Sequence, residues 1–373
     1  PAKYRTSAVA VDATNLAKSL AESMPEERAA AILRSLENLD VRVIAVGTVS
    51  HRMIYDKEVI AVAAGKPVEF RFSNSDDMPH NFVIVTPGSL EEVGMLAEKT
   101  AESPDATARH FVPQSDKVLL GSRLLQPGES QALSFEAPAQ PGVYPYVCTY
   151  PGHWRRMYGA LHVVADLEAY EANPEAYLAA NPLPVRDELL KLLNRNTEWK
   201  VEDFTESIAA LASGTGAARS HQVGENLFKM AACSSCHKMG GEGQALGPDL
   251  ATLEAKMTLS DLVRDVIEPS WRINEKYVSN SLLLADGRVL TGLIVEETTD
   301  AVKIIANPAA PDKPVTVPKD EIDERTVSKV SLMPQGVLNK FTQEEILDLI
   351  AYVYAKGKKD HKLFGGSHSG HSH

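Results

Sequence analysis

The pattern of hydrophobic and polar positions divides the chain into a helical start, a β-rich stretch and a mostly helical second half. After Pro25, apolar residues recur at the spacing of one helix face, which predicts a helical segment within residues 1–40. From residue 41 to residue 165 the pattern changes to short alternating or β-branched runs, spaced about ten residues apart and separated by turn residues. This spacing is typical of an all-β sandwich or barrel.

Short strands are therefore expected throughout 41–165, with a polar, partly helical insertion over 88–120. The expected strands are 41–46, 59–62, 67–73, 80–85, 131–136, 142–147 and 159–164.

The second half begins with an acidic, helix-prone connector over 166–220. A further domain is expected over 221–358, with helices predicted at 223–232, 260–270 and 343–355. A small β insertion at about 277–327 interrupts these helices, and its expected strands are 277–284, 289–296, 302–305 and 315–317. Residues 359–373 form a histidine-rich tail, which is either a copper or zinc ligand or a solvated extension.

Size and charge narrow the class of protein. A chain of 373 residues is long enough for several domains. Its net charge of −12, without any basic block, argues against nucleic acid as a partner. The sequence has no uninterrupted apolar run of about 18 residues, so no transmembrane segment is expected.

Three cysteines are present, and two of them form the motif Cys233-Ser-Ser-Cys236-His237. This is the spacing of c-type haem attachment, in which both thiols bond covalently to the haem and the histidine binds the iron. The alternative, a redox-active Cys-x-x-Cys pair, is expected in a βαβ context that this sequence lacks.

The remaining cysteine stands in the run Cys148-Thr-Tyr-Pro-Gly-His153-Trp-Arg-Arg-Met157, and His80 begins an expected strand upstream. Two histidines, a cysteine and a methionine are the ligand set of a blue-copper electron-transfer site. A lone cysteine is otherwise often a small buried apolar residue. His51, His110 and His162 lack comparable surroundings and are interpreted as ordinary surface or core residues.

This copper run resembles the C-terminal ligand loop of the cupredoxins, most closely the azurin and auracyanin-like type, and the resemblance covers roughly residues 41–165. It implies that His80, Cys148, His153 and Met157 bind copper. It also implies that Asn81 joins the two ligand segments. Pro79 stands where azurin has glycine, which argues against a backbone carbonyl ligand there.

In cupredoxins the C-terminal ligand histidine usually lies at the protein surface, so the resemblance implies an exposed His153. Tyr150, Pro151 and Trp154 would then be apolar neighbours at a docking port for a partner. Arg155 and Arg156 would form its basic rim.

The region 220–357 resembles cytochrome c, in particular the haem-binding domains of planctomycete-type multidomain proteins. Gly224 and Phe228 stand where cytochromes c carry small and aromatic residues on a helix that crosses the C-terminal helix. Pro248 follows the motif at the position whose carbonyl accepts a hydrogen bond from the iron-binding histidine, His237.

The resemblance also implies a methionine as the sixth iron ligand, and Met333, just before the last helix, matches the family's position. Met230 and Met239 lie too close to the attachment motif to reach round the haem. Met257 lies in the segment that leads into an expected helix. The expected β insertion accounts for the long separation between His237 and Met333.

These features together predict a multidomain protein, with an all-β Greek-key cupredoxin sandwich and a mainly α cytochrome c domain that contains a small β insertion. We expect one type 1 copper ion and one haem c, which relay single electrons between donor and acceptor redox proteins. The protein is thus predicted to be a carrier rather than an enzyme. Both centres are typical of an exported, periplasmic protein.

Two alternatives remain at this stage. The chain could be an electron-relay subunit or a fragment of a larger dehydrogenase or respiratory complex. A copper nitrite reductase with a fused cytochrome would need a second cupredoxin domain and a three-histidine copper, and the sequence shows only one cupredoxin pattern.

Overall fold

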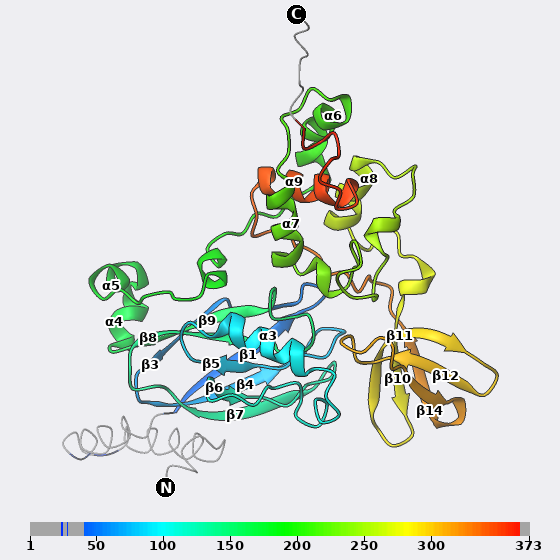
Figure 1. Ribbon diagram of the computed structural model, residues 1–373. Coiled ribbons are helices and arrows are strands. Elements are labelled where there is room, and N and C mark those ends of the chain that lie inside the picture. Colours follow the sequence, from blue (N-terminus) through cyan, green and yellow to red (C-terminus); the bar gives the residue numbers. More distant parts are fainter. Residues whose placement is uncertain (1–23, 25–27, 29–40, 366–373) are drawn as a thin grey trace, which may run out of the picture.

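The structure is a computed structural model that describes Met24, Arg28 and residues 41–365. The helical segment predicted within 1–40 and the end of the histidine-rich tail lie outside these residues. Figure 1 shows a β sandwich, a helical region above it and a separate small sheet beside both. Within the described residues, no helix combines the length and the apolar character needed to cross a membrane.

Two sheets build the sandwich. The first has the strand order β2-β1-β4-β7, with β1 at Arg42–Val49, β2 at Ile54–Tyr55, β4 at Pro67–Ser73 and β7 at Ser130–Glu136. The second has the order β3-β9-β8-β5-β6, with β3 at Val59–Ala63, β9 at Tyr158–Val164, β8 at Gly142–Val147, β5 at Val83–Val85 and β6 at Val118–Gly121. The pairs β1–β4 and β3–β9 run parallel, and the other pairs run antiparallel.

Alternation along the strands explains why the sheets face each other. On β7, buried and exposed residues alternate, so that Leu133 and Phe135 point into the sandwich. Phe70, Phe72 and Phe82 pack in tilted contact there, with ring centroids 5.3 to 5.7 Å apart. Because period-two patterns bury one face of a strand, the strands predicted at 67–73 and 131–136 are found at these positions.

By contrast, β8 is buried along its whole length. Helix α3 (Leu90–Thr100) and a short 3₁₀ turn (Leu189–Leu192) cover the outer face of the second sheet. Helix α3 lies inside the predicted insertion, so the expectation of a partly helical insertion is confirmed. The strands β2 and β6 were not predicted.

The connector leaves the sandwich as two short helices, α4 (Leu167–Ala172) and α5 (Pro174–Ala180). The side chains of Asp166 and Asn173 accept hydrogen bonds from backbone N–H groups of the first turns, which is a typical N-cap.

The helical region contains α6 (Thr205–Ser213), α7 (His221–Met230), α8 (Leu259–Ile267) and α9 (Gln343–Tyr354). Helices α7 and α9 cross closely at Gly224, because a Cβ atom at that position would lie 2.4 Å from the Asp348 carbonyl oxygen. Phe228 packs on Tyr352 one turn later, with ring centroids 5.8 Å apart. This is the helix crossing that the sequence indicated for Gly224 and Phe228.

The additional sheet interrupts this region between α8 and α9. Its strand order is β13-β12-β11-β10-β14, with β10 at Ser279–Leu284, β11 at Val289–Glu297, β12 at Ala301–Ile305, β13 at Val315–Pro318 and β14 at Ile322–Val327. Five strands are present where four were expected, because β14 was not recognised. The predicted domain boundaries as such remain predictions.

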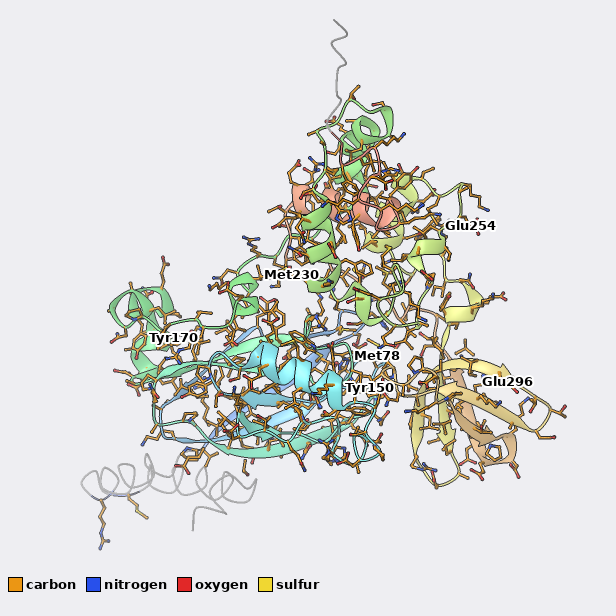
Figure 2. The ribbon with its side chains drawn as sticks, viewed as in Figure 1. Met78, Tyr150, Tyr170, Met230, Glu254 and Glu296 are labelled. Atoms are coloured by element: carbon orange, nitrogen blue, oxygen red, sulfur yellow. The ribbon has the colours of Figure 1, made fainter. Side chains whose placement is uncertain are left out.

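Hydrogen bonds fasten the helical region to one end of the sandwich. Gln335 N–H donates to the carbonyl of His51 at 2.8 Å, and Arg156 Nη2 donates to the carbonyl of Gly336 at 2.7 Å. The additional sheet joins at the same end, since the Tyr150 hydroxyl donates to the carbonyl of Ala306 at 3.0 Å (Figure 2). The loops that carry the candidate ligands therefore lie where the three parts meet.

Candidate metal centres

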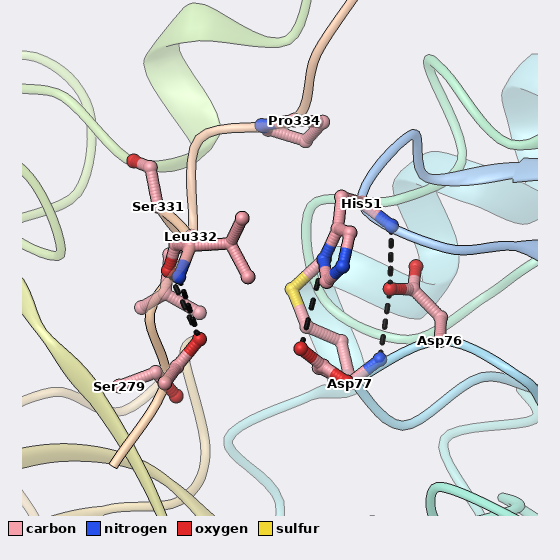
Figure 3. Close-up of a pocket in the computed structure, with 10 residues that line it drawn as sticks. His51, Asp76, Asp77, Ser279, Ser331, Leu332 and Pro334 are labelled. Atoms are coloured by element: carbon pink, nitrogen blue, oxygen red, sulfur yellow. Dashed lines mark hydrogen bonds and ion pairs between the residues drawn. The ribbon is translucent and has the colours of Figure 1, made fainter. Parts of the chain in front are cut away.

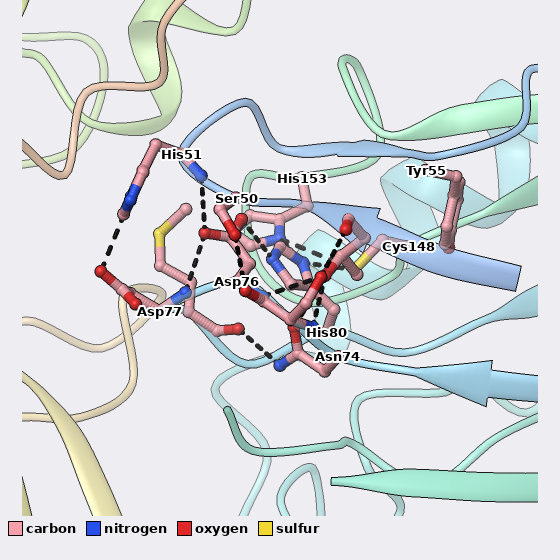
Figure 4. Close-up of polar contacts among 12 residues, drawn as sticks. Ser50, His51, Tyr55, Asn74, Asp76, Asp77, His80, Cys148 and His153 are labelled. Carbon is pink, nitrogen blue, oxygen red and sulfur yellow. Dashed lines mark hydrogen bonds and ion pairs between the residues drawn. The ribbon is translucent and has the colours of Figure 1, made fainter. Parts of the chain in front are cut away.

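Three candidate copper ligands converge at this end of the sandwich. His80 lies just before β5, while Cys148 and His153 lie on the loop between β8 and β9. Their ligand atoms are all within 4.8 Å of one another. Cys148 Sγ lies 3.8 Å from His80 Nδ1 and 3.6 Å from His153 Nδ1, and the two Nδ1 atoms are 3.2 Å apart (Figure 4).

Met157 closes the same loop. Cys148 N–H donates to the Met157 carbonyl at 2.9 Å, and Met157 N–H donates to the His153 carbonyl at 2.8 Å. The methionine is fully buried and packs in the same apolar cluster as Cys148. Ten residues of chain thus bring three of the four candidate ligands together.

The chemistry of this donor set fits copper. The three donor atoms face one another in a buried site. Burial raises the pKa of the Cys148 thiol to about 12, so the thiol gives up its proton and becomes a ligand when a metal cation binds. Burial, with the neighbouring His80, also lowers the pKa of His153, so the imidazole is held neutral, as a metal ligand must be. Thiolate and thioether favour reduced copper, while imidazole suits both oxidation states.

Asn81 links the two ligand segments. Its Oδ1 accepts from Thr149 N–H at 2.8 Å, and its Nδ2 donates to Thr149 Oγ1 at 2.9 Å and to the His110 carbonyl at 2.8 Å. Thr149 follows Cys148 directly, so one amide side chain connects the residue after the thiol with the residue after His80.

A second neighbour of the site was missed in the sequence. Asp76 Oδ2 lies 3.0 Å from His80 Nε2, on the side of the ring away from Cys148 (Figure 4). Burial alone would raise the pKa of Asp76, but hydrogen bonds from His80 and from the backbone N–H groups of His51 and Asp77 lower it below its usual value. A carboxylate four residues before a ligand histidine was the available signal.

The expectation of an exposed His153 is wrong. Only 3% of this residue is accessible, because the helical region covers the copper loop. Gly152 faces the haem-attachment motif so closely that a Cβ atom there would lie 2.8 Å from the Cβ atom of Ser235.

Most of the expected rim of this port is also buried, and Arg155 is half-buried. Tyr150 and Trp154 are buried, and so is Arg156, which is bound to the Gly336 carbonyl. Arg155 pairs with Glu98 on α3 and stacks over Trp154. Trp154 and Arg155 therefore face α3, which covers the sandwich, whereas Tyr150 and Arg156 contact the protein's own second half.

The haem-attachment motif follows α7 directly. Cys233 opens a 3₁₀ turn and Cys236 follows it, and neither cysteine is part of a disulfide. His237 Nδ1 donates to the Pro248 carbonyl at 2.9 Å, which leaves Nε2 as the nitrogen able to bind a metal. Burial lowers the pKa of His237, so its ring is neutral, as iron ligation requires.

Glycines shape the surroundings of this histidine. A Cβ atom at Gly247 would lie 2.7 Å from Cε1 of the His237 ring, and one at Gly243 would lie 2.2 Å from the His237 carbonyl oxygen. The loop after the motif can therefore pass this close to His237 only because residues 243 and 247 are glycines. This arrangement fits a covalently attached haem with His237 as an iron ligand.

The two methionine candidates for the sixth position differ in their surroundings. Met333 is half-buried against the apolar core of the helical region. Met257 touches the same core, but its sulfur already has a partner, because it lies 3.8 Å from Arg272 Nη2. Met230 is exposed on α7, and Met239 is buried. The choice of Met333 stays a prediction.

Comparisons with known proteins agree with both centres. Residues 42–164 match the copper binding proteins of the plastocyanin/azurin family, and residues 222–275 match cytochrome c. Auracyanin-A of Chloroflexus aurantiacus is 31% identical over 121 residues, which are 32% of this chain and 73% of auracyanin-A. Auracyanin-B of the same organism is 36% identical over 99 residues, which are 26% of this chain and 40% of auracyanin-B.

Among solved structures, the reduced auracyanin of Roseiflexus castenholzii is 30% identical and covers 33% of this chain and 96% of its own length, with a TM-score of 0.30. The protein has a type 1 copper site formed by His80, Cys148, His153 and Met157, and a haem c site that contains Cys233 and Cys236. Through residues 42–164 the chain belongs to the plastocyanin/azurin family of copper proteins, and a cytochrome c domain follows in the same chain.

Proposed function

We propose that this protein is an electron carrier that relays single electrons between its copper and haem sites within one molecule. Each cofactor supplies a reversible one-electron couple when bound, and the chain provides ligation, insulation and orientation. The contact of Gly152 with Ser235 carries the proposal, since it joins the loop of three copper ligands to the turn between the two haem-binding cysteines.

Burial of the ligands supports the same role. His80, Cys148 and Met157 are fully buried and His153 nearly so, which leaves no room for a substrate beside the ligand atoms. A site of this kind suits outer-sphere electron exchange rather than bond-making chemistry. We therefore propose a carrier and not an enzyme.

The alternative of a cytochrome-fused copper reductase gains no support. Among the described residues, a single cluster of three histidine, cysteine or acidic side chains could hold a metal ion, and it is the one at Cys148. A three-histidine substrate site would need a second.

Further parts of the proposal concern the setting of the protein. We place it in the periplasm, where haem c and type 1 copper are commonly found, with separate redox proteins as donor and acceptor. A role as the relay subunit of a larger dehydrogenase or respiratory complex is compatible with the same electron path.

A redox titration of the purified protein, followed by visible absorption, tests the proposed function. We expect one copper and one haem per chain and two separate reversible one-electron transitions. A protein that binds haem but never develops a copper–thiolate band, or whose haem cannot be cycled, would not be such a relay.

A further inference from the structure

A buried carboxylate adjoins one copper ligand on its outer side. Asp76 is 2% exposed, and its Oδ2 lies 3.0 Å from Nε2 of the fully buried His80. An ionised carboxylate can only accept a hydrogen bond, so Nε2 of the imidazole carries the proton. The lone pair is therefore on Nδ1, the atom that faces Cys148 and His153.

Backbone donors hold this carboxylate in place. Asp76 Oδ1 accepts from His51 N–H at 2.9 Å and from Asp77 N–H at 2.8 Å (Figure 4). His51 adopts a left-handed backbone conformation, with φ of 61°, which a residue other than glycine rarely does without support. The carboxylate thus has a fixed orientation toward His80.

The helical region completes this support. The His51 carbonyl accepts from Gln335 N–H at 2.8 Å, and Gln335 stands two residues after Met333. Figure 3 shows His51 between Asp76 and Asp77 on one side and the segment from Ser331 to Pro334 on the other, around a small pocket. Docking of the helical region and orientation of Asp76 therefore depend on the same loop.

The negative charge of Asp76 is not cancelled by a lysine or arginine. Among the salt bridges of the described residues, its partner is His80. A buried charge interacts strongly with its surroundings, because the interior screens it less than water does. A carboxylate behind a ligand histidine also raises the basicity of that ligand.

We propose that Asp76 is a positioning residue that fixes the ring of His80 for copper and holds the copper reduction potential down. The carboxylate stabilises the more highly charged Cu(II) more than Cu(I), so it opposes reduction. This inference deepens the proposed function and rests on it, since the potential of the copper decides how readily its electron is passed on.

The test compares Asp76→Asn with Asp77→Asn in the full, copper- and haem-loaded protein. Asn retains the shape and an acceptor oxygen for the backbone donors but lacks the charge. Asp77 is the matched control, because it is the next carboxylate along, its side chain is 59% exposed, and it faces the His51 ring rather than His80.

We expect Asp76→Asn to favour Cu(I) at least tenfold in a spectroelectrochemical titration, which equals about 59 mV for one electron. The haem potential in the same sample should not move, and Asp77→Asn should change the copper far less. Equal shifts in both variants, or no shift in Asp76→Asn, would overturn the proposal.

A measurement on the unaltered protein covers the case in which Asp76→Asn does not fold. In the fully reduced, Cu(I)-loaded protein, the Nε2 proton of His80 should exchange slowly with solvent in NMR spectra, because it is bonded to a buried carboxylate. Rapid exchange would contradict the inference.

These outcomes are separable from those of the proposed function. A shifted copper potential without electron exchange between the sites would uphold the role of Asp76 and reject the relay. Electron exchange between the sites, found together with an unshifted copper potential in Asp76→Asn, would uphold the relay and reject the role of Asp76.

Discussion

Cys148 is the residue on which the copper site depends most, since the other two cysteines of the chain belong to the haem motif. Its thiol lies within 3.8 Å of both ligand imidazoles. A hydroxyl cannot replace a soft thiolate as a copper ligand.

Cys148→Ser should therefore abolish the intense thiolate-to-copper absorption and leave the haem bands intact. The absorption spectrum of the copper-treated variant measures both at once, with the haem as the internal control. Retention of the copper band in this variant would show that another residue supplies the thiolate-like ligand.

Met333 is the second residue whose role can be decided by substitution. Removal of an iron ligand opens a coordination position, so Met333→Ala should bind added imidazole or cyanide more tightly than the parent protein by at least tenfold. Met257→Ala is the matched control, because Met257 touches the same core and its sulfur faces Arg272. A ligand titration by absorption distinguishes them, and tight binding by Met257→Ala alone would reassign the sixth ligand.

The ligand residues could be predicted from sequence because most of their geometry is local. Cys148, His153 and Met157 share one loop, and Cys233, Cys236 and His237 share one turn, so spacing alone carries the chemistry. Asp76 was not predicted, because its contact with His80 depends on the backbone conformation at His51.

At the level of elements, the turn of the haem-attachment motif and the copper loop are in close contact through two residues, Ser235 and Gly152. Gly152 has a φ of 84°, and Ser235 occupies the space in which a side chain at Gly152 would lie. Gly128 has nearly the same φ, 81°, but has no heavy atom within 4 Å of the corresponding position. The chain thus contains its own control for the contact.

Gly152→Ala should slow electron exchange between the copper and haem sites, whereas Gly128→Ala should not. Both variants lose about 1 kcal/mol of stability, because an L residue is strained at positive φ. Only the first also separates the copper loop from the haem turn. Flash-initiated kinetics on both proteins measure the difference, and equal rates would show that this contact is not the route.

Helix α7 presents a similar close approach to α9 at Gly224. A methyl group there must displace the backbone at Asp348, so Gly224→Ala should destabilise the protein by about 1–3 kcal/mol, despite the better helix propensity of alanine. Gln222→Ala, on the exposed side of the same helix, should stay within about 0.5 kcal/mol. Denaturant unfolding, followed by far-UV circular dichroism, provides both values, and a neutral Gly224→Ala would mean that the helices can separate at little cost.

Elements with a regular alternation of hydrophobic and polar residues could be predicted from the sequence, and elements without such a pattern could not. Strand β7 alternates cleanly and was expected at its observed position. Strand β14, with the sequence Ile-Asp-Glu-Arg-Thr-Val, is mostly exposed and charged, and β2 has only two residues, so neither gives a clear pattern.

On the scale of the whole molecule, the decisive feature is that the usual copper port is turned inward. The prediction of an exposed His153 came from a family resemblance. That prediction would be correct for a sandwich that had no helical region packed against it. No local pattern reveals that Gln335 and Gly336 will bind His51 and Arg156, because such docking pairs residues far apart in the sequence.

An internal port has a consequence for how the protein responds to salt. Charge steering between separate proteins is screened within about 8 Å at physiological ionic strength. Exchange across a contact that is already formed needs no such steering. The rate between the two sites should therefore not depend on ionic strength.

The central claim is tested most directly by reducing one site in a short light pulse and following the other in time. Intramolecular relay predicts a first-order exchange whose rate is the same at all protein concentrations and at low and high salt. A rate that rises in proportion to protein concentration would mean that electrons pass between molecules, and it would contradict the account.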